Sequence, residues 1–456
     1  MEHQSKPTLA KRSGAPGSPA GQPGWGGKLT SLLWWALTRY GRIKHRYLLP
    51  VYRRFGLLGK ERRADGTLQP SWTLRGAQAL VRTFHHTFYR DQLKAVMDRV
   101  QTSKGAVVFL PSVSWKVVNT QRTHHLAREF ARQGYVSIFD GSNSTDEVSG
   151  FTEVEPNFFL FRGSDNVLPE IEDPILWTLT YNFDRRDAYA SSARTIYDWI
   201  DDFEVFPFDQ TFLEKNHQRA LREATLVVSV ARRLHNQALA VRPDALYLPN
   251  GVEYEHFAGV STLPDDDGID ESWRNYALGR KPIAGYYGAI AEWFDYDLLE
   301  AVARLRPDWN FLLIGPMHDS SLRERGQSML ECPNIRWLGQ REYGQLPGYL
   351  RLFDVAMIPF VINNITLATS PLKLYEYFAG GKPVVSTPMP ECEAFPEVLI
   401  ARNSDEFSRA LDLAKDRGGD ARFDNRLRKL GYENSWTARV NLVLAHLAMV
   451  DSQAAL

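Results

Sequence analysis

Short apolar runs alternate with amphipathic stretches along the chain from residue 105 onward. One series of runs rich in Val, Ile, Leu and aromatic residues predicts strands at 105–111, 135–141, 157–163, 174–180, 194–200, 225–230 and 245–249. A second series predicts strands at 282–288, 310–316, 334–339, 354–360 and 382–388. Residues 120–133 and 212–223 are among the helical candidates. Strands that alternate with helices form parallel sheets, so the pattern predicts an α/β fold of two doubly wound, Rossmann-like domains that face a cleft.

The two series of strands set the expected domain organisation of the 456-residue chain. This length exceeds the roughly 250–300 residues that one hydrophobic core normally serves, so two lobes with additions are expected. An acidic, turn-rich stretch separates the series, and we expect the lobes to join near residues 252–281. The predicted parts are a disordered tail (1–27), a basic and aromatic extension (28–104), a first Rossmann-like domain (105–255), a second one (256–432) and a closing helix that packs back toward the first domain (433–456).

The N-terminal extension contains a basic and aromatic segment at residues 28–63. It carries ten Lys and Arg residues against the single acid Glu61, with Trp34, Trp35, Tyr40 and further aromatic residues between them. This composition is typical of a segment that lies on an anionic membrane surface. It is also compatible with a helical appendage that packs on the body of the protein and exposes its arginines. The sequence leaves both interpretations open.

The composition of the chain argues against nucleic acid as a partner and against a disulfide framework or a zinc site. Lys plus Arg and Asp plus Glu both number 54, so no net charge favours nucleic acid as a partner. Cys332 and Cys392 are too few for a disulfide framework and lack the spacing of a zinc site, which favours a reducing cytoplasm. No apolar run reaches the roughly 20 residues of a membrane-spanning helix, and the N-terminus lacks a signal-peptide pattern. We expect a cytoplasmic protein without a metal site, peripheral on the inner face of the membrane if residues 28–63 bind lipid.

The segment TSPLKLYEYFAGGKPVVSTP, residues 369–388, carries the clearest chemical signal. Ser370 is a good helix cap, Pro371 suits the first helical position, and Gly380 with Gly381 ends the helix before the next strand. The amino end of a helix presents unpaired N–H groups and a positive dipole, which is what a diphosphate requires. Lys373 adds a full positive charge in the first turn. This end of the segment is therefore a candidate phosphate site.

Side chains one turn further along the same helix extend the candidate site. Lys373, Glu376 and Tyr377 are spaced to share one face, whereas Leu374 and Phe378 are expected to turn toward the core. A carboxylate one turn below a phosphate site is well placed to accept the hydroxyl hydrogens of a ribose. The alternative is an ordinary capped helix with a surface Lys–Glu pair, which stabilises a helix by a few tenths of a kcal/mol.

The segment SPLKLYEYFAGGKPVVST resembles the donor-binding signature of the GT-B glycosyltransferases, in particular the retaining group classed as glycosyltransferase family 4 and its relatives. Residues 224–234 with 247–257, residues 282–302 and residues 433–444 resemble further parts of these proteins in the same order. The resemblance covers about residues 105–450. It implies a first domain that presents the acceptor and a second that binds a nucleotide-diphosphate sugar. It implies no cofactor beyond this co-substrate, and a divalent ion is neither required nor excluded.

The resemblance also implies roles for individual residues of this chain. Glu376 is expected to contact the donor ribose, and Lys373 to neutralise phosphate charge as a catalytic residue. The donor-binding residues expected from the resemblance are Glu376, Ser370, Pro371, Leu372, Lys373 and Gly288. Tyr377 is expected to join them, because its spacing places it on the same helix face. Two positions depart from the family pattern: Ala368 stands where a second Glu often contacts the sugar, and residues 289–297 lack the usual Arg and Lys. Stabilisation of the leaving diphosphate is therefore expected to fall mainly to Lys373 and the helix end.

Polar residues near two strand ends of the first domain are candidates for acceptor binding and catalysis. The loop after the first strand carries Trp115, Asn119, Arg122 and His124, and it is expected to face the interlobe cleft. Asp198 and Asp201 lie at or just past the end of another strand. His124 and Asp198 are candidate catalytic residues; Trp115, Asn119, Arg122 and Asp201 are acceptor-side candidates. The alternatives are a surface histidine without a ligand and acidic residues that only cap local structure.

These observations predict transfer of a sugar from a nucleotide-diphosphate sugar to a hydroxyl group of a glycan or lipid-linked acceptor, with retention of configuration, in cell-envelope or exopolysaccharide assembly. Two alternatives remain. Nucleotide-sugar epimerases share the two-lobed scaffold, because a fold does not determine a function. A non-catalytic partner subunit on the same scaffold would also be compatible with Ala368 and the cation-poor loop at 289–297.

Overall fold

The computed structural model describes residues 60–62, 68–70, 89–115, 117, 120–141, 150–163, 167–259, 281–317 and 322–454. Residues 60–62, 68–70, 322–325 and 453–454 are described by their backbone alone. The tail predicted at 1–27 and most of the basic segment 28–63 lie outside the described residues. The chain divides into two units, residues 1–83 and 84–456. In the first unit, β1 (Lys60–Arg62) and β2 (Leu68–Pro70) form an antiparallel pair.

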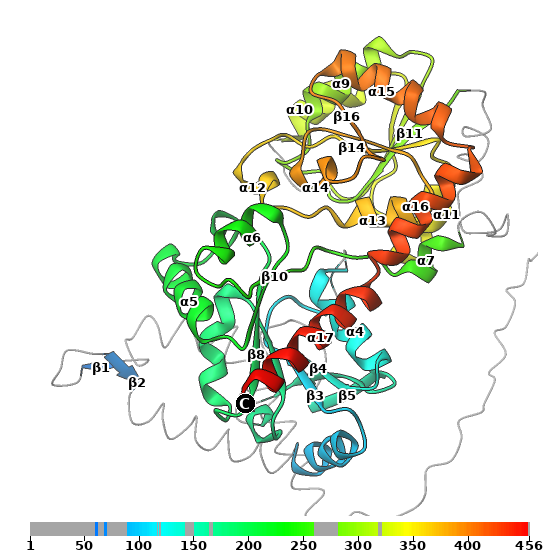
Figure 1. The fold of residues 1–456 in the computed structure, drawn as a ribbon. Coiled ribbons are helices and arrows are strands. Elements are labelled where there is room, and N and C mark those ends of the chain that lie inside the picture. The colour runs from blue at the N-terminus through cyan, green and yellow to red at the C-terminus, as the bar shows by residue number, and fades with distance from the viewer. Residues whose placement is uncertain are drawn as a thin grey trace, which may run out of the picture. The chain divides into compact units, whose positions relative to one another are not determined.

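A sheet of eight strands forms the first lobe of the second unit, in the spatial order β10-β9-β8-β7-β3-β4-β6-β5 (Figure 1). All neighbouring pairs are parallel except β5 with β6. The strands are β3 (Ala106–Phe109), β4 (Val136–Asp140), β5 (Gly150–Glu155), β6 (Phe158–Arg162), β7 (Ile175–Thr178), β8 (Arg194–Trp199), β9 (Leu226–Ser229) and β10 (Leu246–Tyr247).

A parallel sheet of six strands forms the second lobe, in the order β13-β12-β11-β14-β15-β16. The strands are β11 (Ile283–Tyr287), β12 (Asn310–Ile314), β13 (Ile335–Trp337), β14 (Val355–Ile358), β15 (Val384–Ser386) and β16 (Leu399–Ile400). The prediction of two doubly wound α/β lobes is confirmed, and each predicted strand is present. Two strands of these lobes were missed: β5 is an edge strand with charged residues, and β16 has only two residues. The strands β1 and β2 of the first unit were not predicted either.

Helices cover both sheets. Residues 89–101 are helical. In the first lobe the helices are η2 (Leu168–Glu170), η3 (Thr180–Ala188), η4 (Phe203–Val205), α4 (Arg122–Arg132), α5 (Gln210–Glu223) and α6 (Arg232–Leu239). After the first sheet come α7 (Tyr254–Ala258), α9 (Tyr296–Leu305), α10 (Leu322–Leu330), η6 (Tyr343–Gln345), α11 (Leu346–Arg351), α12 (Asn364–Leu367), α13 (Leu372–Ala379), α14 (Pro390–Glu393), α15 (Ser404–Arg417), α16 (Ala421–Glu433) and α17 (Trp436–Ala454).

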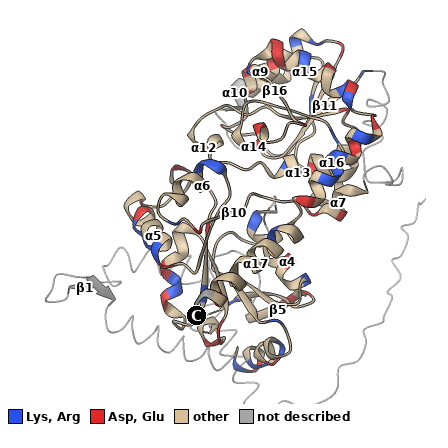
Figure 2. Ribbon diagram, in the orientation of Figure 1, with Lys and Arg blue, Asp and Glu red and all other residues tan. Residues whose placement is uncertain are grey.

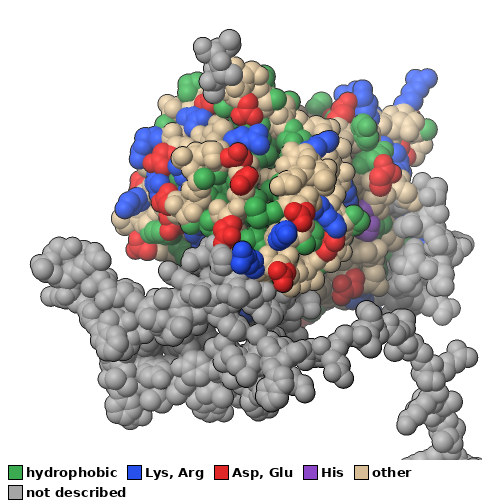
Figure 3. Space-filling view, turned by 90° about the horizontal axis from the view of Figure 1, so that it is seen from below, with side chains coloured by type: hydrophobic (Ala, Val, Ile, Leu, Met, Phe, Trp, Pro, Cys, Tyr) green, Lys and Arg blue, Asp and Glu red, His purple; other side chains and the backbone are tan. Residues whose placement is uncertain are grey.

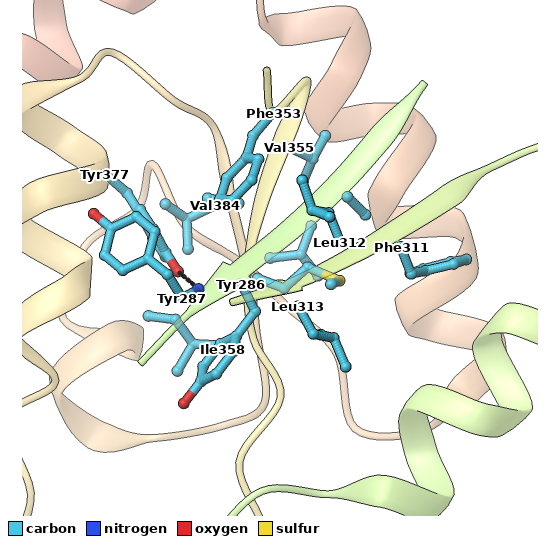
Figure 4. Packing of buried hydrophobic residues seen from close by; sticks show 14 of the residues in the cluster. Tyr286, Tyr287, Phe311, Leu312, Leu313, Phe353, Val355, Ile358, Tyr377 and Val384 are labelled. Carbon is cyan, nitrogen blue, oxygen red and sulfur yellow. Dashed lines mark hydrogen bonds between the residues drawn. The ribbon is translucent and has the colours of Figure 1, made fainter. Parts of the chain in front are cut away.

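The core of the second lobe is rich in aromatic side chains. Tyr286, Tyr287 and Phe353 pack with Leu312 and Val355 between the sheet and its helices (Figure 4). Because both faces of this parallel sheet are covered, its strands are continuous apolar runs rather than alternating ones. This is why the apolar runs in the sequence located the strands.

The closing helix α17 belongs to the second half of the chain but packs on the first lobe (Figure 1). Trp436, Val440, Val443 and Leu447 join the hydrophobic core of that lobe. At its start, the backbone N–H of Trp436 donates to the carbonyl of Val252 at 3.0 Å. The chain therefore passes between the lobes twice, at two segments that are hydrogen-bonded to each other.

The charged side chains of the described residues are interspersed in sign over the face that Figure 3 shows. This distribution is compatible with a chain that has 54 basic and 54 acidic residues and no net charge. Any strong local field must therefore come from particular side chains, such as those of the cavity described below.

The loop after β11 is held by a close approach of two glycine backbones. Gly315, just after β12, has φ +137°, and a Cβ there would lie 1.9 Å from the carbonyl oxygen of Gly288. Gly288 itself has φ +132°. Neither position accepts a side chain without a shift of the backbone, so both glycines are required for the path of this loop.

We expect Gly315→Ala to lower the free energy of unfolding by about 3 kcal/mol, because the new methyl group overlaps backbone and the positive φ is strained. Urea unfolding measures the change. Gly419→Ala is the matched control, since Gly419 also has a positive φ (+94°) but no atom within 4 Å of its Cβ position. That variant should lose about 1 kcal/mol. Equal losses in the two variants would contradict a role for the Gly288–Gly315 contact.

Candidate active site

A cavity of about 480 Å³ lies between the two lobes at the carboxyl ends of their strands. Ile200 and Asp201 follow β8, Val230 follows β9, and Gly288 follows β11 on its wall. Open α/β sheets bind ligands at this edge because the loops that leave the parallel strands converge there. The wall also includes the start of α13, with Ser370, Pro371, Leu372, Lys373 and Glu376.

Helix α13 begins one residue later than the sequence suggested. Its N-cap is Pro371, and no side chain caps it. The prediction that Ser370 caps this helix is wrong. Ser370 instead turns to the first lobe: its Oγ accepts a hydrogen bond from the backbone N–H of Asn250 at 3.2 Å, and its carbonyl accepts one from Nδ2 of Asn250 at 2.7 Å. The start of α13 is thereby attached to the segment that leaves the first sheet.

Lys373 places its ammonium group in the cavity wall. Nζ lies 4.8 Å from the ring centre of Phe360 and 5.2 Å from that of Tyr286. Among the described residues, no carboxylate lies within ion-pair distance of this group. Burial lowers the pKa of Lys373 to about 8, and the charge of Glu376 offsets part of this effect. A Cβ on Gly288 would lie 2.9 Å from Cε of Lys373, so the glycine makes room for the lysine.

Glu376 lies one turn further along α13 and also lines the cavity. It is 7% exposed. Burial raises the pKa of Glu376 to about 7, while the Tyr287 hydroxyl and the charge of Lys373 act in the opposite direction. A carboxylate in this position can accept hydrogen bonds from vicinal hydroxyl groups, which would also restore the interactions it lost on leaving water.

Tyr377 does not line the cavity. Its side chain is buried in the core of the second lobe, where its hydroxyl accepts a hydrogen bond from the backbone N–H of Tyr287 at 3.3 Å (Figure 4). The sequence placed Tyr377 on the face of Lys373 and Glu376 as a donor-binding residue. The structure corrects this placement: Tyr377 points into the core, where its hydroxyl binds the backbone at the end of β11.

Arg122, at the start of α4, lines the first-lobe wall of the cavity. Its Nε donates to Oδ2 of Asp198 at 2.8 Å. Asp198 is 0% exposed, does not line the cavity, and also accepts a hydrogen bond from the indole N–H of Trp177 at 3.0 Å. The acceptor-side prediction for Arg122 therefore fits its position. The position of Asp198 does not fit the catalytic role expected of it, because its carboxylate is enclosed by protein.

Asp201 is the carboxyl group that the first lobe does present to the cavity. Burial, together with the neighbouring carboxylates of Asp198 and Asp202, raises the pKa of Asp201 to about 7, while the charge of Arg122 acts in the opposite direction. A carboxyl group that titrates near neutral pH can exchange hydrogen bonds with a hydroxyl group either as donor or as acceptor.

His124 and Trp115 lie elsewhere. The Nδ1 atom of His124 accepts a hydrogen bond from the backbone N–H of Gln121, and its Nε2 lies 3.1 Å from the carbonyl oxygen of Ser114. Trp115 packs against Phe139 and Phe158, with Arg128 over its ring at 4.7 Å. Neither residue lines the cavity, so the positions of both give no support to the expected contact with a substrate. Asn119 lies outside the described residues.

Several residues on the cavity wall were not found from the sequence. They follow strands of the second lobe or the end of β10 and include Asn250, Trp293, Arg341, Tyr343 and Phe360. The guanidinium of Arg341 is held by the hydroxyl of Tyr349 at 2.9 Å and the carbonyl of Leu338 at 2.8 Å. Because ligands bind at the carboxyl ends of parallel strands, the sequence could have indicated these loops. It gave no local motif that would single out these particular side chains.

Direct contacts between the lobes border the cavity on the side of α6 and α14. The carboxylate of Glu391, in α14, accepts hydrogen bonds from the backbone N–H of Arg232 at 2.6 Å and from the hydroxyl of Tyr247. Nη1 of Arg233 donates to the side-chain oxygen of Asn364 at 3.1 Å. Figure 2 shows the basic start of α6 and the acidic residues of α14. These contacts hold the first and second lobes together across the cavity.

Among the described residues, no group of three or more His, Cys, Asp or Glu side chains is arranged to hold a metal ion. In the same part of the chain, every helix is too short or too polar to span a bilayer.

The second lobe matches a known family. Residues 281–414 match the family model described as "Glycosyl transferases group 1". Solved structures similar to the whole two-lobed unit include a glycosyltransferase from Rickettsia africae (13% identity, 76% of this chain and 98% of that chain, TM-score 0.58). Another is HepE from Anabaena in complex with UDP (12% identity, 75% and 99% coverage, TM-score 0.57). The chain has the GT-B fold of the glycosyltransferases, which confirms the resemblance at the level of this fold. Membership of the retaining group stays a prediction.

Two curated proteins are similar in sequence. One is the putative teichuronic acid biosynthesis glycosyltransferase TuaH of Bacillus subtilis, 26% identical over 250 residues that make up 52% of this chain and 60% of that protein. The other is the phosphatidyl-myo-inositol mannosyltransferase of Mycobacterium tuberculosis, 28% identical over 193 residues, 42% of this chain and 46% of that protein. The chain thus spans roughly half the length of the curated relatives it matches.

The raised pKa of Glu376 has a consequence for stability. Its pKa is about 7 in the folded chain against an ordinary value of 4.5, so the folded state binds the proton more tightly than the unfolded state. The free energy of unfolding of the wild type therefore falls as the pH rises from about 4.5 to 7. Glu376→Gln removes this titration. We expect the variant to equal the wild type near pH 4 and to exceed it by about 3 kcal/mol at pH 8.

Urea unfolding of wild type and Glu376→Gln at pH 4, 6 and 8 measures this difference. Glu214→Gln, at an exposed position on α5, is the control, and its difference in stability from the wild type should be the same at each pH. A constant difference between Glu376→Gln and wild type across this range would contradict the burial of an ionisable Glu376.

Proposed function

We propose that the chain transfers a sugar from a nucleotide-diphosphate sugar to a hydroxyl group of an acceptor bound by the first lobe. The observation that carries the proposal is the ammonium group of Lys373. It lies in the first turn of α13, in the wall of an interlobe cavity, without a carboxylate at ion-pair distance among the described residues. A buried cation at a helix amino end is stabilised by an anionic ligand, and a diphosphate supplies one.

The cavity wall suggests how the donor binds. The diphosphate would lie against the backbone of Pro371 and Leu372, with Lys373 and Gly288 beside it. The ribose would then reach the carboxylate of Glu376, one turn further along α13. Tyr343 borders the same cavity and lies near Glu376, so the base would extend toward its ring.

In the proposed reaction, the bond between the anomeric carbon of the sugar and the diphosphate oxygen breaks while the acceptor oxygen bonds to that carbon. The negative charge that develops on the diphosphate is stabilised by Lys373 and the amino end of α13. For a retaining transfer, the acceptor proton would pass to the leaving phosphate oxygen on the same face of the sugar. Asp201 would orient the acceptor hydroxyl by a hydrogen bond. NMR analysis of the anomeric configuration of the first product distinguishes retention from inversion.

The acceptor proposed here is a glycan or lipid-linked glycan of the cell envelope. The support is the naming of the two curated relatives, one for teichuronic acid biosynthesis and one for mannosyl transfer to phosphatidyl-myo-inositol. Assembly of such acceptors at the cytoplasmic face of a membrane would suit the basic and aromatic segment 28–63. No metal ion is assigned to the reaction.

We expect Lys373→Ala to lower kcat by about 100-fold or more, the usual loss when a group that stabilises developing charge is removed. Steady-state kinetics with the preferred nucleotide sugar measures the effect. Lys415→Ala, at an exposed position of α15, is the control and should keep wild-type turnover. Wild-type kcat in Lys373→Ala would remove the basis of the proposal.

The epimerase alternative has a separate test. Incubation of the wild type with nucleotide sugar alone identifies an epimerase, which would interconvert sugars without an acceptor.

If segment 28–63 binds membrane, the full-length chain should float with vesicles that contain anionic phospholipid, and it should float less as salt is raised. A variant that lacks residues 1–59 keeps the β1 and β2 residues and provides the comparison; it should remain in the dense fraction. Vesicles of neutral phospholipid are the control. Equal flotation of the two chains would show that these residues do not anchor the protein.

A further inference from the structure

The guanidinium group of Arg122 is hydrogen-bonded through two of its three nitrogen atoms, and the third has no partner. The residue is 6% exposed and lines the first-lobe wall of the cavity. Its Nε donates to Asp198 at 2.8 Å, and its Nη1 donates to the carbonyl of Pro249 and to Oδ1 of Asn250, both at 3.2 Å. The third nitrogen, Nη2, is buried and has no hydrogen-bond partner. A buried donor without a partner is costly, so a ligand oxygen would stabilise it.

The same arginine is connected to the amino end of α13. Asn250 accepts from Arg122 through Oδ1 and binds both the hydroxyl and the carbonyl of Ser370, the residue before the N-cap Pro371. Asn250 therefore connects the guanidinium of Arg122 directly to the residue before the N-cap of α13. Arg122, Asn250, Ser370 and Lys373 all line one cavity. The guanidinium of the first lobe and the ammonium of the second are placed to act on one bound anion.

We propose that Arg122 is an oxyanion-binding residue whose Nη2 donates to a phosphate or carboxylate oxygen of a substrate bound at the amino end of α13. This inference rests on the proposed function and adds a contact from the opposite lobe. The loop at 289–297 contains no Arg or Lys, so Arg122 supplies a cation that this loop lacks. Asp198 and Trp177 are then positioning residues, because their hydrogen bonds orient the guanidinium plane.

The charges around Arg122 bear on the kind of oxygen it binds. Asp198 pairs with the Nε side of the guanidinium and leaves its own Oδ1 buried without a partner, so the ion pair is incomplete on both sides. Arg439 lies nearby and donates to the carbonyl of Asn250 at 3.1 Å, which adds positive charge. Two sources of a suitable oxygen remain: the diphosphate of the donor and an anionic group on the acceptor. The connection through Asn250 to Ser370 favours the diphosphate.

The test compares the wild type with Arg122→Gln/Asp198→Asn. The double substitution removes both charges together, because Arg122→Gln alone would leave a fully buried carboxylate without its cation and destabilise the fold. Arg122→Lys is a second variant that keeps the positive charge beside Asp198 but loses the forked geometry. Arg132→Gln, further along α4 with its side chain half exposed, is the matched control. Calorimetry gives the Kd of each chain for whichever of UDP, GDP and ADP binds the wild type most tightly.

If the oxygen belongs to the donor, both Arg122 variants should bind the nucleoside diphosphate about 10-fold or more weakly, the usual loss of a hydrogen bond to a charged group. Arg132→Gln should bind like the wild type. If the oxygen belongs to the acceptor, nucleotide affinity should be unchanged. Inorganic phosphate should then raise the Tm of the nucleotide-saturated wild type and leave that of the double variant unchanged.

The inference is overturned if the Arg122 variants match the wild type in both measurements. That result is distinct from a failure of the proposed function. If Lys373→Ala loses nucleotide binding while the Arg122 variants keep both the nucleotide affinity and the phosphate response of the wild type, only the role of Arg122 is removed. A wild-type chain that binds none of the three nucleotides would remove the donor site itself.

Discussion

The site depends on the burial of two ionisable groups one turn apart on α13. Removal from water disfavours the charged forms of both Lys373 and Glu376, and it shifts their pKa values in opposite directions, to about 8 and about 7. The fold accommodates this because the lysine lies over aromatic rings and Gly288 leaves room beside it. A ligand with an anionic end and a pair of hydroxyl groups would supply what both residues lack, which is why the geometry favours a nucleotide.

Much of the fold could be predicted from the sequence, because parallel strands buried on both faces are continuous apolar runs that stand out from the helices around them. The amino end of α13 was also predictable, since Pro371, Lys373 and Glu376 lie within one short segment. The orientation of single side chains was not. Tyr377 was placed in the cavity on helical spacing alone, but a buried tyrosine also needs a hydrogen-bond partner, and the N–H of Tyr287 in the core provides it. His124 was a candidate from its position in a loop, yet its ring nitrogens lie against Gln121 and Ser114, which are close in sequence.

The structure gives physical meaning to the two departures from the family pattern. Ala368 is 0% exposed and packs in an apolar cluster with first-lobe residues such as Tyr197 and Val230. A glutamate would place an unpaired carboxylate in that cluster, so the small residue belongs to the contact between the lobes. Although residues 289–297 carry no Arg or Lys, other parts of the cavity wall do, since Arg122 at the start of α4 and Arg341 after β13 line it. A local motif does not reveal these arginines, because they are distant in sequence from the loop at 289–297.

The cavity belongs to neither lobe alone, and the contacts that join the lobes therefore belong to the site. Asn250 of the segment leaving the first sheet holds Ser370 at the start of α13, and Glu391 of α14 accepts a hydrogen bond from the first turn of α6. Both contacts place a polar group of one lobe at a helix end of the other, where a shift of an ångström would break the hydrogen bond. The spacing of the lobes is thus fixed by directional bonds as well as by apolar packing. A substrate that bridges Lys373 and Arg122 would add a third link of the same kind, so donor binding and the contacts between the lobes would stabilise each other.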